Sequence, residues 1–247
     1  MEKKRQIAAV LILLALIGVI AYRHSTGKDL EKYEASFFDV FDTQTQIIGY
    51  ASSKEQFSEQ MSLIKDKFQY YNDLYDIYHD YEGMNNIKTI NDNAGIQPVK
   101  VDEEIIELLK LGITMDEKTD GNMNIAMGSV LSIWHDYREA GSEDPYSAEL
   151  PPMDELERAA EHTDIHDIVI DEEASTVYLT DPDMSLDVGS IGKGYAVQKV
   201  AEYAKNELGI RYMLFSVGGN VCAIGGHPDG SAWAVGIQNP DVESDQA

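Results

Sequence analysis

The sequence is poor in cysteine, and that scarcity excludes some chemistry. Cys222 is the only cysteine among the 247 residues, so an intrachain disulfide is excluded. It lies in an apolar run, where we expect a small buried hydrophobic side chain rather than a reactive thiol. Avoidance of cysteine suits an exported bacterial protein but does not prove export. No cysteine lies directly after the apolar N-terminal run, so we expect no lipid anchor attached through cysteine.

Basic residues are also scarce. Lys and Arg number 19 against 44 Asp and Glu, which gives a formal net charge of −25. Such an acidic surface repels the phosphates of nucleic acids and of anionic lipids, and we therefore expect no nucleic-acid partner. The length suits one large domain or two small ones with a sizeable core.

The N-terminal segment differs in character from the rest of the chain. Residues 7–22 are almost purely apolar and follow the basic triplet Lys3-Lys4-Arg5. A spanning helix needs about 20 apolar residues, so this run lies on the border between a membrane anchor and a signal peptide. We favour an uncleaved anchor, whose basic flank places the bulk of the chain outside the cytoplasm of a bacterium. Residues 23–36 are then expected to form a tether, and residues 37–247 the main domain.

Hydrophobic periodicity predicts a mixed α+β fold, with helices packed on a largely antiparallel sheet. Its strongest signal is a long helix over residues 57–78, capped by Ser52 or Ser53. Irregular loops are expected over residues 81–98 and 139–152. Further helices are expected over residues 101–117, 128–138, 153–161 and 193–208, the last ended by Gly209. Strands are expected over residues 37–50 (a pair or one bent strand), 165–170, 176–179, 213–217 and 232–237.

One stretch, Ser185–Tyr195, has the composition of a ligand-binding turn. An apolar run leads into it and a helical pattern leads out, and it contains Asp187, Lys193 and three glycines. Glycine permits close approach of the backbone to a phosphate, and a helix N-terminus presents free N–H groups. The Walker A and Rossmann motifs both fail, because positions that they reserve for glycine hold Asp187 and Val197. A plain strand-to-helix turn remains an alternative, but an acid beside a cation favours a nucleotide or metal site.

A weaker candidate for a metal site is the segment that contains His162, Asp164 and His166. It crosses from a helix end into a strand, so we expect its side chains to diverge. Neither histidine has a third ligand nearby in the sequence, and a metal site is therefore disfavoured.

The stretch Leu186–Val197 resembles the signature Asp-Leu-Gly-Gly/Ala-Ile-x-Lys-Gly-Tyr-Ala-Val of the ApbE-type flavin transferases, the FAD:protein FMN transferases. At this length the match is specific, and shorter matches extend it from Phe37 onward. They are Phe41–Thr43 (Met-Gly-Thr in the family), Tyr81–Asn91 (an aromatic residue, then Ser-x-x-Asn), Gly121–Ile125 with Trp134 (Gly-x-x-Asp, then Trp) and Val217–Asn220 (Gly-Gly-Asp).

The resemblance implies a T-fold-like architecture and an exported enzyme. Such an enzyme splits the pyrophosphate of FAD, releases AMP and attaches FMN to an acceptor protein. The product is a phosphoester on a Thr or Ser side chain, and the metal is Mg²⁺. Displacement at phosphorus needs alignment and charge neutralisation more than covalent help, which suits the residues of this turn.

The resemblance also implies roles for individual residues. Asp187 and Lys193 would bind FAD, and the backbone oxygen of Ser190 would be a ligand of Mg²⁺. Tyr81 would stack on the flavin ring. Further contacts with the flavin are implied for Phe41, Asn122, Met123 and Asn124. No catalytic base is identified.

The sequence departs from the family pattern in two ways. It stops before the family's Asp-x-x-x-Thr metal segment and its His-x-Ile-Asp-Pro sequence, and Asn124 and Asn220 stand where the family has Asp. We expect a piece of a longer transferase. The alternative is a non-catalytic extracellular FAD-binding protein or an inactive fragment. A structural adhesin is less favoured, because it leaves Asp187 and Lys193 without a role.

Overall fold

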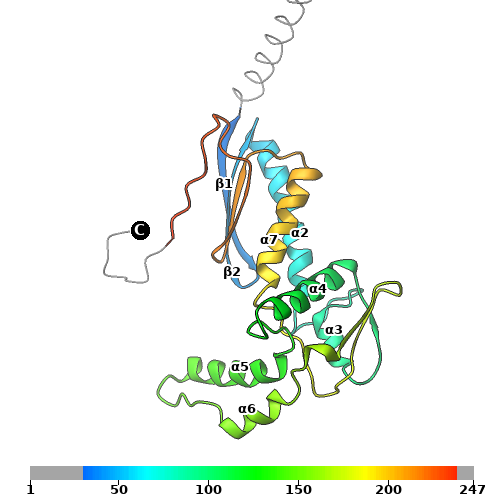
Figure 1. Cartoon of the computed structure of the whole chain (residues 1–247). Coiled ribbons are helices and arrows are strands. Elements are labelled where there is room, and N and C mark those ends of the chain that lie inside the picture. The colour runs from blue at the N-terminus through cyan, green and yellow to red at the C-terminus, as the bar shows by residue number, and fades with distance from the viewer. Residues whose placement is uncertain (1–29, 238–247) are drawn as a thin grey trace, which may run out of the picture. The chain divides into compact units, whose positions relative to one another are not determined.

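The computed structural model describes residues 30–237, which divide into two compact units. Among these residues, one unit contains 30–65 and 197–237, and the other contains 66–196. Helices α2 (Lys54–Tyr75) and α7 (Gly192–Asn206), labelled in Figure 1, contribute residues to both units. Within residues 30–237, no helix has the length and apolar character needed to cross a bilayer. The predicted anchor over residues 7–22 lies outside the described residues.

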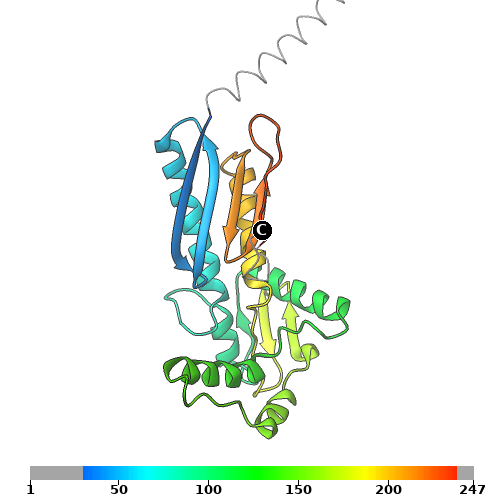
Figure 2. The ribbon, with the colours of Figure 1, turned by 90° about the vertical axis from the view of Figure 1, so that its left-hand side faces the viewer.

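The first unit is built on a four-stranded antiparallel sheet of order β1-β2-β6-β7. Its strands are β1 (Glu31–Val40), β2 (Thr43–Ala51), β6 (Met213–Val217) and β7 (Asn220–Ile224). Figure 2 shows α2 and α7 along the same face of this sheet. Helix α2 packs closely there, because a Cβ atom on Gly49 of β2 would approach the Phe57 ring to 3.1 Å. The buried residues of this face, such as Ile47 and Phe215, form the core of the unit.

The sequence predicted most of this unit. The strand pair over residues 37–50 is confirmed, although β1 begins at Glu31, within the predicted tether. The predicted strand over residues 232–237 is wrong, since these residues form no strand. Their apolar residues alternate, but Val235 and Ile237 are exposed, and no described strand pairs with them. Alternation alone cannot supply the hydrogen-bonding neighbour that a strand needs.

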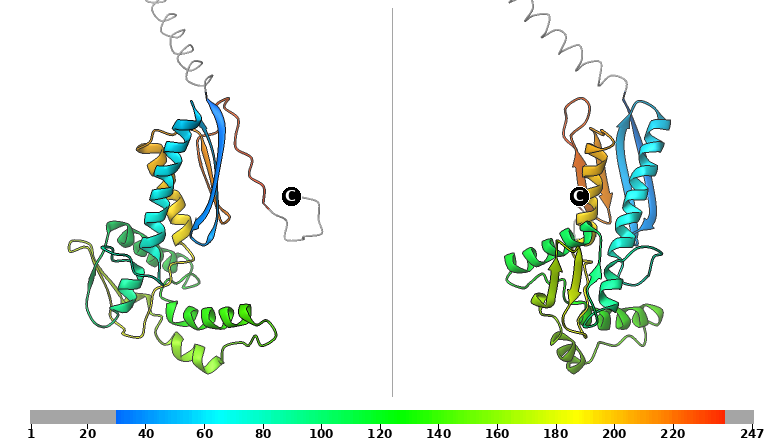
Figure 3. Two further views of the ribbon diagram at one scale, coloured as in Figure 1. Left: turned by 180° about the vertical axis from the view of Figure 1, so that it is seen from behind. Right: turned by 90° about the vertical axis from the view of Figure 1, so that its right-hand side faces the viewer.

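The second unit combines helices with a three-stranded antiparallel sheet of order β3-β5-β4 (Figure 3). The strands are β3 (Val99–Lys100), β4 (Ile168–Asp171) and β5 (Thr176–Leu179), and the helices are α3 (Ile87–Asp92), α4 (Glu103–Lys118), α5 (Gly128–Glu143) and α6 (Met153–Ala160). A 3₁₀ turn, η1, spans Ile165–Asp167. Fully buried side chains, among them Phe68, Leu108 and Leu179, form the core.

All five predicted helices and the 165–179 hairpin are present, and Ser53 accepts a hydrogen bond from the backbone N–H of Gln56 at the start of α2. The predicted end of the first helix at residue 78 is wrong, because α2 ends at Tyr75 and Tyr78 is exposed. The first strand of the hairpin begins at Ile168, after η1. Two loop predictions need correction. Helix α3 lies within the expected 81–98 loop and was missed because its six residues are too few for a periodic signal. Helix α5 continues to Glu143, beyond the predicted end at residue 138. That last turn has no buried residue, so hydrophobic periodicity could not reveal it.

Candidate functional site

The backbone of residues 185–187 is held on both sides by other parts of the second unit. Asn91 accepts a hydrogen bond from the Leu186 N–H (2.7 Å) and donates one to the Leu186 carbonyl (3.0 Å). The N–H of Asp187 donates to the Ile125 carbonyl at 2.9 Å, and the N–H of Gly128 donates to the Ser185 carbonyl at 3.0 Å. This segment is therefore fixed before the glycine turn begins.

Gly128 is required for that arrangement. A Cβ atom at this position would lie 2.5 Å from the Ser185 hydroxyl and 2.6 Å from the Ser185 backbone carbonyl. Real Cβ atoms do not approach backbone so closely. Glycine thus lets the start of α5 lie against the segment that carries Asp187.

The glycine turn fixes the Asp187 side chain. Asp187 Oδ1 accepts the Gly189 N–H at 2.8 Å, and the N–H groups of Ile191 and Gly192 return to the Val188 carbonyl. Helix α7 then begins at Gly192. In its first turn the N–H groups of Gly192 and Tyr195 are bonded to the carbonyls of Val188 and Ile191, which leaves those of Lys193 and Gly194 for a ligand. Lys193 is half-buried in this turn and forms no ion pair with any described residue. The predicted cation thus lies in the first turn of a helix, where an anion is favoured, and the predicted acid lies in the glycine turn before it.

A cavity of about 450 Å³ includes Asp187 in its wall. The rest of the wall comes from the segment after α2, from α5 and from the loop before α6. The lining residues are Tyr78, Leu131, Trp134, His135, Tyr137, Arg138, Glu149, Leu150 and Asp187. Apolar and aromatic walls with a few charged groups are typical of a site for a planar organic ligand.

The aromatic wall is organised around His135. The rings of Tyr78 and His135 lie 5.1 Å apart, inclined at 31°, and the Tyr78 hydroxyl is 3.4 Å from His135 Nδ1. Arg138 approaches the same nitrogen at 2.8 Å. Tyr78 and Trp134 remain 54% and 42% exposed, so part of each side chain is accessible to a ligand. Burial and the nearby Asp187 carboxylate raise the pKa of Tyr78, which keeps its phenol protonated at neutral pH.

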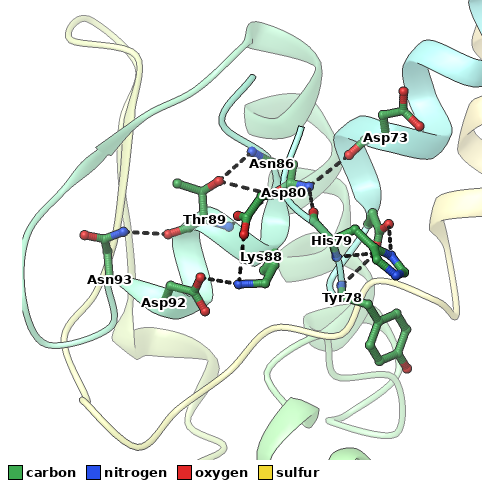
Figure 4. Close-up of polar contacts among 10 residues, drawn as sticks. Asp73, Tyr78, His79, Asp80, Asn86, Lys88, Thr89, Asp92 and Asn93 are labelled. Carbon is green, nitrogen blue, oxygen red and sulfur yellow. Dashed lines mark hydrogen bonds and ion pairs between the residues drawn. The ribbon is translucent and has the colours of Figure 1, made fainter. Parts of the chain in front are cut away.

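The loop that carries Tyr78 is anchored by the fully buried Asn86 (Figure 4). The Asn86 amide donates to the carbonyls of Asp73 and His79, and its oxygen accepts the Thr89 N–H at the start of α3. The backbone N–H of Tyr78 donates to Asp76 at 2.6 Å. Figure 4 shows the Tyr78 ring pointing away from the polar cluster around Asn86. The backbone that presents Tyr78 is therefore well defined.

Tyr81, the tyrosine expected to stack on a flavin, does not line this cavity. Its hydroxyl donates to Asp76 at 2.7 Å, and burial together with this bond raises its pKa. Tyr78 occupies the cavity wall instead. Both tyrosines belong to the same aromatic-rich stretch of sequence. Only the structure shows that Tyr78, just beyond the end of α2, is the one that lines the cavity.

Asn122, Met123 and Asn124 lie in the connection between α4 and α5, outside the cavity wall. Their hydrogen bonds shape this connection. Asn122 donates to the Thr119 carbonyl, the Met123 N–H donates to the Thr119 hydroxyl, and Asn124 links the Thr163 carbonyl to the Ala126 N–H. Their predicted contact with a flavin stays a prediction.

Phe41 and Asn220 belong to the first unit. Phe41 and Asp42 form the β1–β2 turn, and both have a positive φ, 54° and 50°. A two-residue hairpin with positive φ at both positions usually contains glycine or asparagine, so this turn is strained. Asn220 begins β7, beside Gly218 and Gly219. The role expected for Phe41 stays a prediction.

Metal-binding side chains gather elsewhere in the second unit. Within residues 30–237, the one group of three or more suitable side chains is His162, Asp181 and Asp183, whose ligand atoms lie within 4.8 Å of one another. The sequence indicated no third ligand near His162, because Asp181 and Asp183 come from the loop after β5. His162 Nδ1 lies 2.7 Å from Asp181. Ser190, the predicted Mg²⁺ ligand, is exposed and belongs to the glycine turn instead.

Residues 41–247 match the ApbE family. The chain belongs to this family. Among similar proteins, the FAD:protein FMN transferase of Escherichia coli K12 is 26% identical over 180 residues, which cover 72% of this chain and 50% of that protein. The protein of the same name from Treponema pallidum is 29% identical over 62% of this chain and 44% of its own length. The chain thus spans about half the length of these ApbE relatives.

Solved structures of ApbE proteins share the fold. The flavin transferase ApbE of Vibrio cholerae superposes with a TM-score of 0.70 at 20% identity, covering 87% of this chain and 66% of that structure. The ApbE protein of Thermotoga maritima gives a TM-score of 0.71 at 24% identity, covering 87% and 65%. The predicted mixed α/β architecture, with helices on antiparallel sheets, is confirmed.

Proposed function

We propose that this protein takes part in Mg²⁺-dependent transfer of FMN from FAD to a Thr or Ser side chain of an acceptor protein. The observation that carries the proposal is the shared wall of one cavity. An ApbE-type glycine turn supplies Asp187 there, and Tyr78 and Trp134 supply exposed aromatic surface. The names of the similar proteins support flavin transfer as the reaction.

In this proposal, each group at the cavity has a separate task. Tyr78 and Trp134 hold the flavin ring by stacking. Lys193 and the N–H groups of the first turn of α7 offset the negative charge of the pyrophosphate. The acceptor hydroxyl attacks the flavin-side phosphorus, where a new P–O bond forms. The bond to the bridging oxygen breaks, AMP leaves with that oxygen, and the hydroxyl proton is released.

The residues at the turn fit a Mg²⁺ ion. Asp187 Oδ1 is occupied by the Gly189 N–H, whereas Oδ2 has no hydrogen-bond partner among residues 30–237. Together with the Ser190 backbone carbonyl, it offers hard oxygen donors, and Mg²⁺ commonly takes its other ligands from phosphates and water. When bound, Mg²⁺ would neutralise phosphate charge.

We further propose that the reaction takes place outside the cytoplasm. The support is the apolar run over residues 7–22 behind Lys3, Lys4 and Arg5. External protease added to intact bacterial cells lacking a cell wall should then digest the protein. Protection of the protein until the cells are lysed would contradict this location.

The transferase proposal is tested by mixing the protein with FAD, Mg²⁺ and an acceptor that carries a threonine. AMP should appear in solution, and the acceptor should become fluorescent on a denaturing gel. Asp187→Asn should reduce AMP release about a hundredfold, because loss of one preorganised charged group at a reacting site has effects of this order. Glu173→Gln, an exposed acid in the β4–β5 turn, is the matched control. FAD binding that is indifferent to EDTA and yields no AMP would favour a non-catalytic FAD-binding protein instead.

A further inference from the structure

Arg138 is a cation that pairs with no carboxylate among residues 30–237, although the protein has a net charge of −25. It lines the cavity together with Asp187 and Glu149, yet it forms no ion pair with any residue of the described range. By contrast, Arg158 on α6 pairs with Asp154 at 2.9 Å. A guanidinium that avoids the abundant acids and faces an aromatic cavity indicates an anionic ligand.

The Arg138 side chain is nevertheless held in place. Its Nη2 lies 2.8 Å from His135 Nδ1. A guanidinium can only donate hydrogen bonds, so Nδ1 is the acceptor and the imidazole proton resides on Nε2. His135 Nε2 lies 3.0 Å from Glu139 Oε1, and this carboxylate accepts a hydrogen bond from the Nε2–H group. One nitrogen of Arg138 is therefore engaged, and its other N–H donors are left for a ligand.

His135 also links the aromatic ring of Tyr78 to the guanidinium of Arg138 in the cavity wall. His135 packs against the Tyr78 ring at 5.1 Å and holds Arg138 through its edge. The cavity thus offers a stacking surface for a planar ring and, beside it, a fork of donors that suits phosphate oxygens. A planar ring that carries a phosphoryl group satisfies both.

We propose that Arg138 binds a phosphoryl group of the flavin nucleotide and that His135 is its positioning residue. The inference rests on the proposed function and extends it, since it assigns the discrimination between phosphorylated and unphosphorylated flavins to α5. In the proposed function, Asp187 contacts the nucleotide from the glycine turn before α7, and Lys193 contacts it from the first turn of α7.

The test compares the affinities of FMN and riboflavin, which differ by the phosphate alone, using the quenching of flavin fluorescence. Arg138→Gln should weaken FMN binding about tenfold to a hundredfold, the range expected for hydrogen bonds to a charged group, and leave riboflavin binding unchanged. Arg158→Gln should change neither affinity. Equal losses for both flavins would show that Arg138 only packs the wall, and unchanged FMN binding would overturn the proposal outright.

A double-mutant cycle tests the part played by His135. His135→Ala should lower the ratio of FMN to riboflavin affinity in the wild-type background and leave this ratio unchanged when Arg138 is already Gln. A further drop in the Arg138→Gln background would contradict the positioning role. Failure of the wild-type protein to bind FAD or FMN would overturn the proposed function as well, whereas normal wild-type binding with an unaffected Arg138→Gln variant overturns this inference alone.

Discussion

Two walls of the same cavity are built in different ways. The Asp187 wall is fixed through its backbone, by paired bonds from Asn91 and by the close approach of Gly128 to Ser185. The α5 wall is made of side chains on one helix face, where His135 contacts Arg138, Glu139 and Tyr78. The Asp187 wall depends on particular residues at particular positions, because its backbone is held by specific contacts. The side chains of the α5 wall can be replaced without loss of the helix.

This difference explains what each wall can contribute. A rigid turn holds a phosphate or metal in one geometry, because its N–H and carbonyl groups cannot rearrange independently. A helix face with half-exposed rings can vary its residues without loss of fold, and it therefore suits the part of the site that selects the ligand. The following predictions separate the two walls.

The largest effect is expected from Gly128→Ala. The added Cβ atom would meet the Ser185 backbone at 2.6–2.7 Å, and overpacking against backbone should lower the free energy of unfolding by about 3 kcal/mol or more. Thermal unfolding followed by circular dichroism measures the change. Gly141→Ala in the same helix is the control, since its Cβ atom would lie 3.1 Å from the Ala148 side chain and 3.7 Å from the nearest backbone atom. Equal melting temperatures for the two variants would show that the turn is not held through Gly128.

An intermediate effect is expected from Tyr78→Ala. Loss of one stacking surface should weaken flavin binding by about 1 kcal/mol, or five- to tenfold, with little change in unfolding temperature because the ring is half-exposed. Tyr81→Ala should leave flavin affinity unchanged, since its hydroxyl is bonded to Asp76. Flavin fluorescence titration of both variants decides between the two tyrosines. A loss confined to Tyr81→Ala would restore the assignment made from the sequence.

The smallest effect concerns His162, at the end of α6, and its partner Asp181, in the loop that leads to the Asp187 segment. The hydrogen bond to Asp181 raises the pKa of His162. The Asp183 N–H and then His162 lower the pKa of Asp181. Stability from a raised histidine pKa is complete below the unfolded value of about 6.5 and is lost as pH rises through the folded value. The protein should therefore melt at a slightly lower temperature at pH 8.5 than at pH 6.

His162→Gln should reduce that difference between the two pH values, and His166→Gln should preserve it. His166 is the matched control because it is exposed and its ring forms no ion pair with a described residue. Melting curves of the three proteins at both pH values make the comparison. An identical pH dependence in wild type and His162→Gln would mean that this pair does not tie α6 to the loop.

Features that depend on local order could be recognised from the amino-acid sequence alone. The 3–4 spacing of apolar residues in α2, the glycines around Asp187 and the C-terminal glycine of α7 can be recognised without any neighbour, because helix faces and tight turns impose their pattern on consecutive residues. The family resemblance relied mainly on one such contiguous stretch, Leu186–Val197, and the match of residues 41–247 to the ApbE family confirms it.

The contacts between residues that are distant in the sequence became known only from the folded chain. Tyr78 rather than Tyr81 reaches the cavity because α2 ends at Tyr75 and Asn86 holds the loop that follows. Arg138 joins Asp187 in one wall because Gly128 brings the start of α5 against Ser185. His162 meets the Asp181 carboxylate, 19 residues further along the chain, for a similar reason. These contacts depend on packing between elements, and no local pattern of residues specifies that packing.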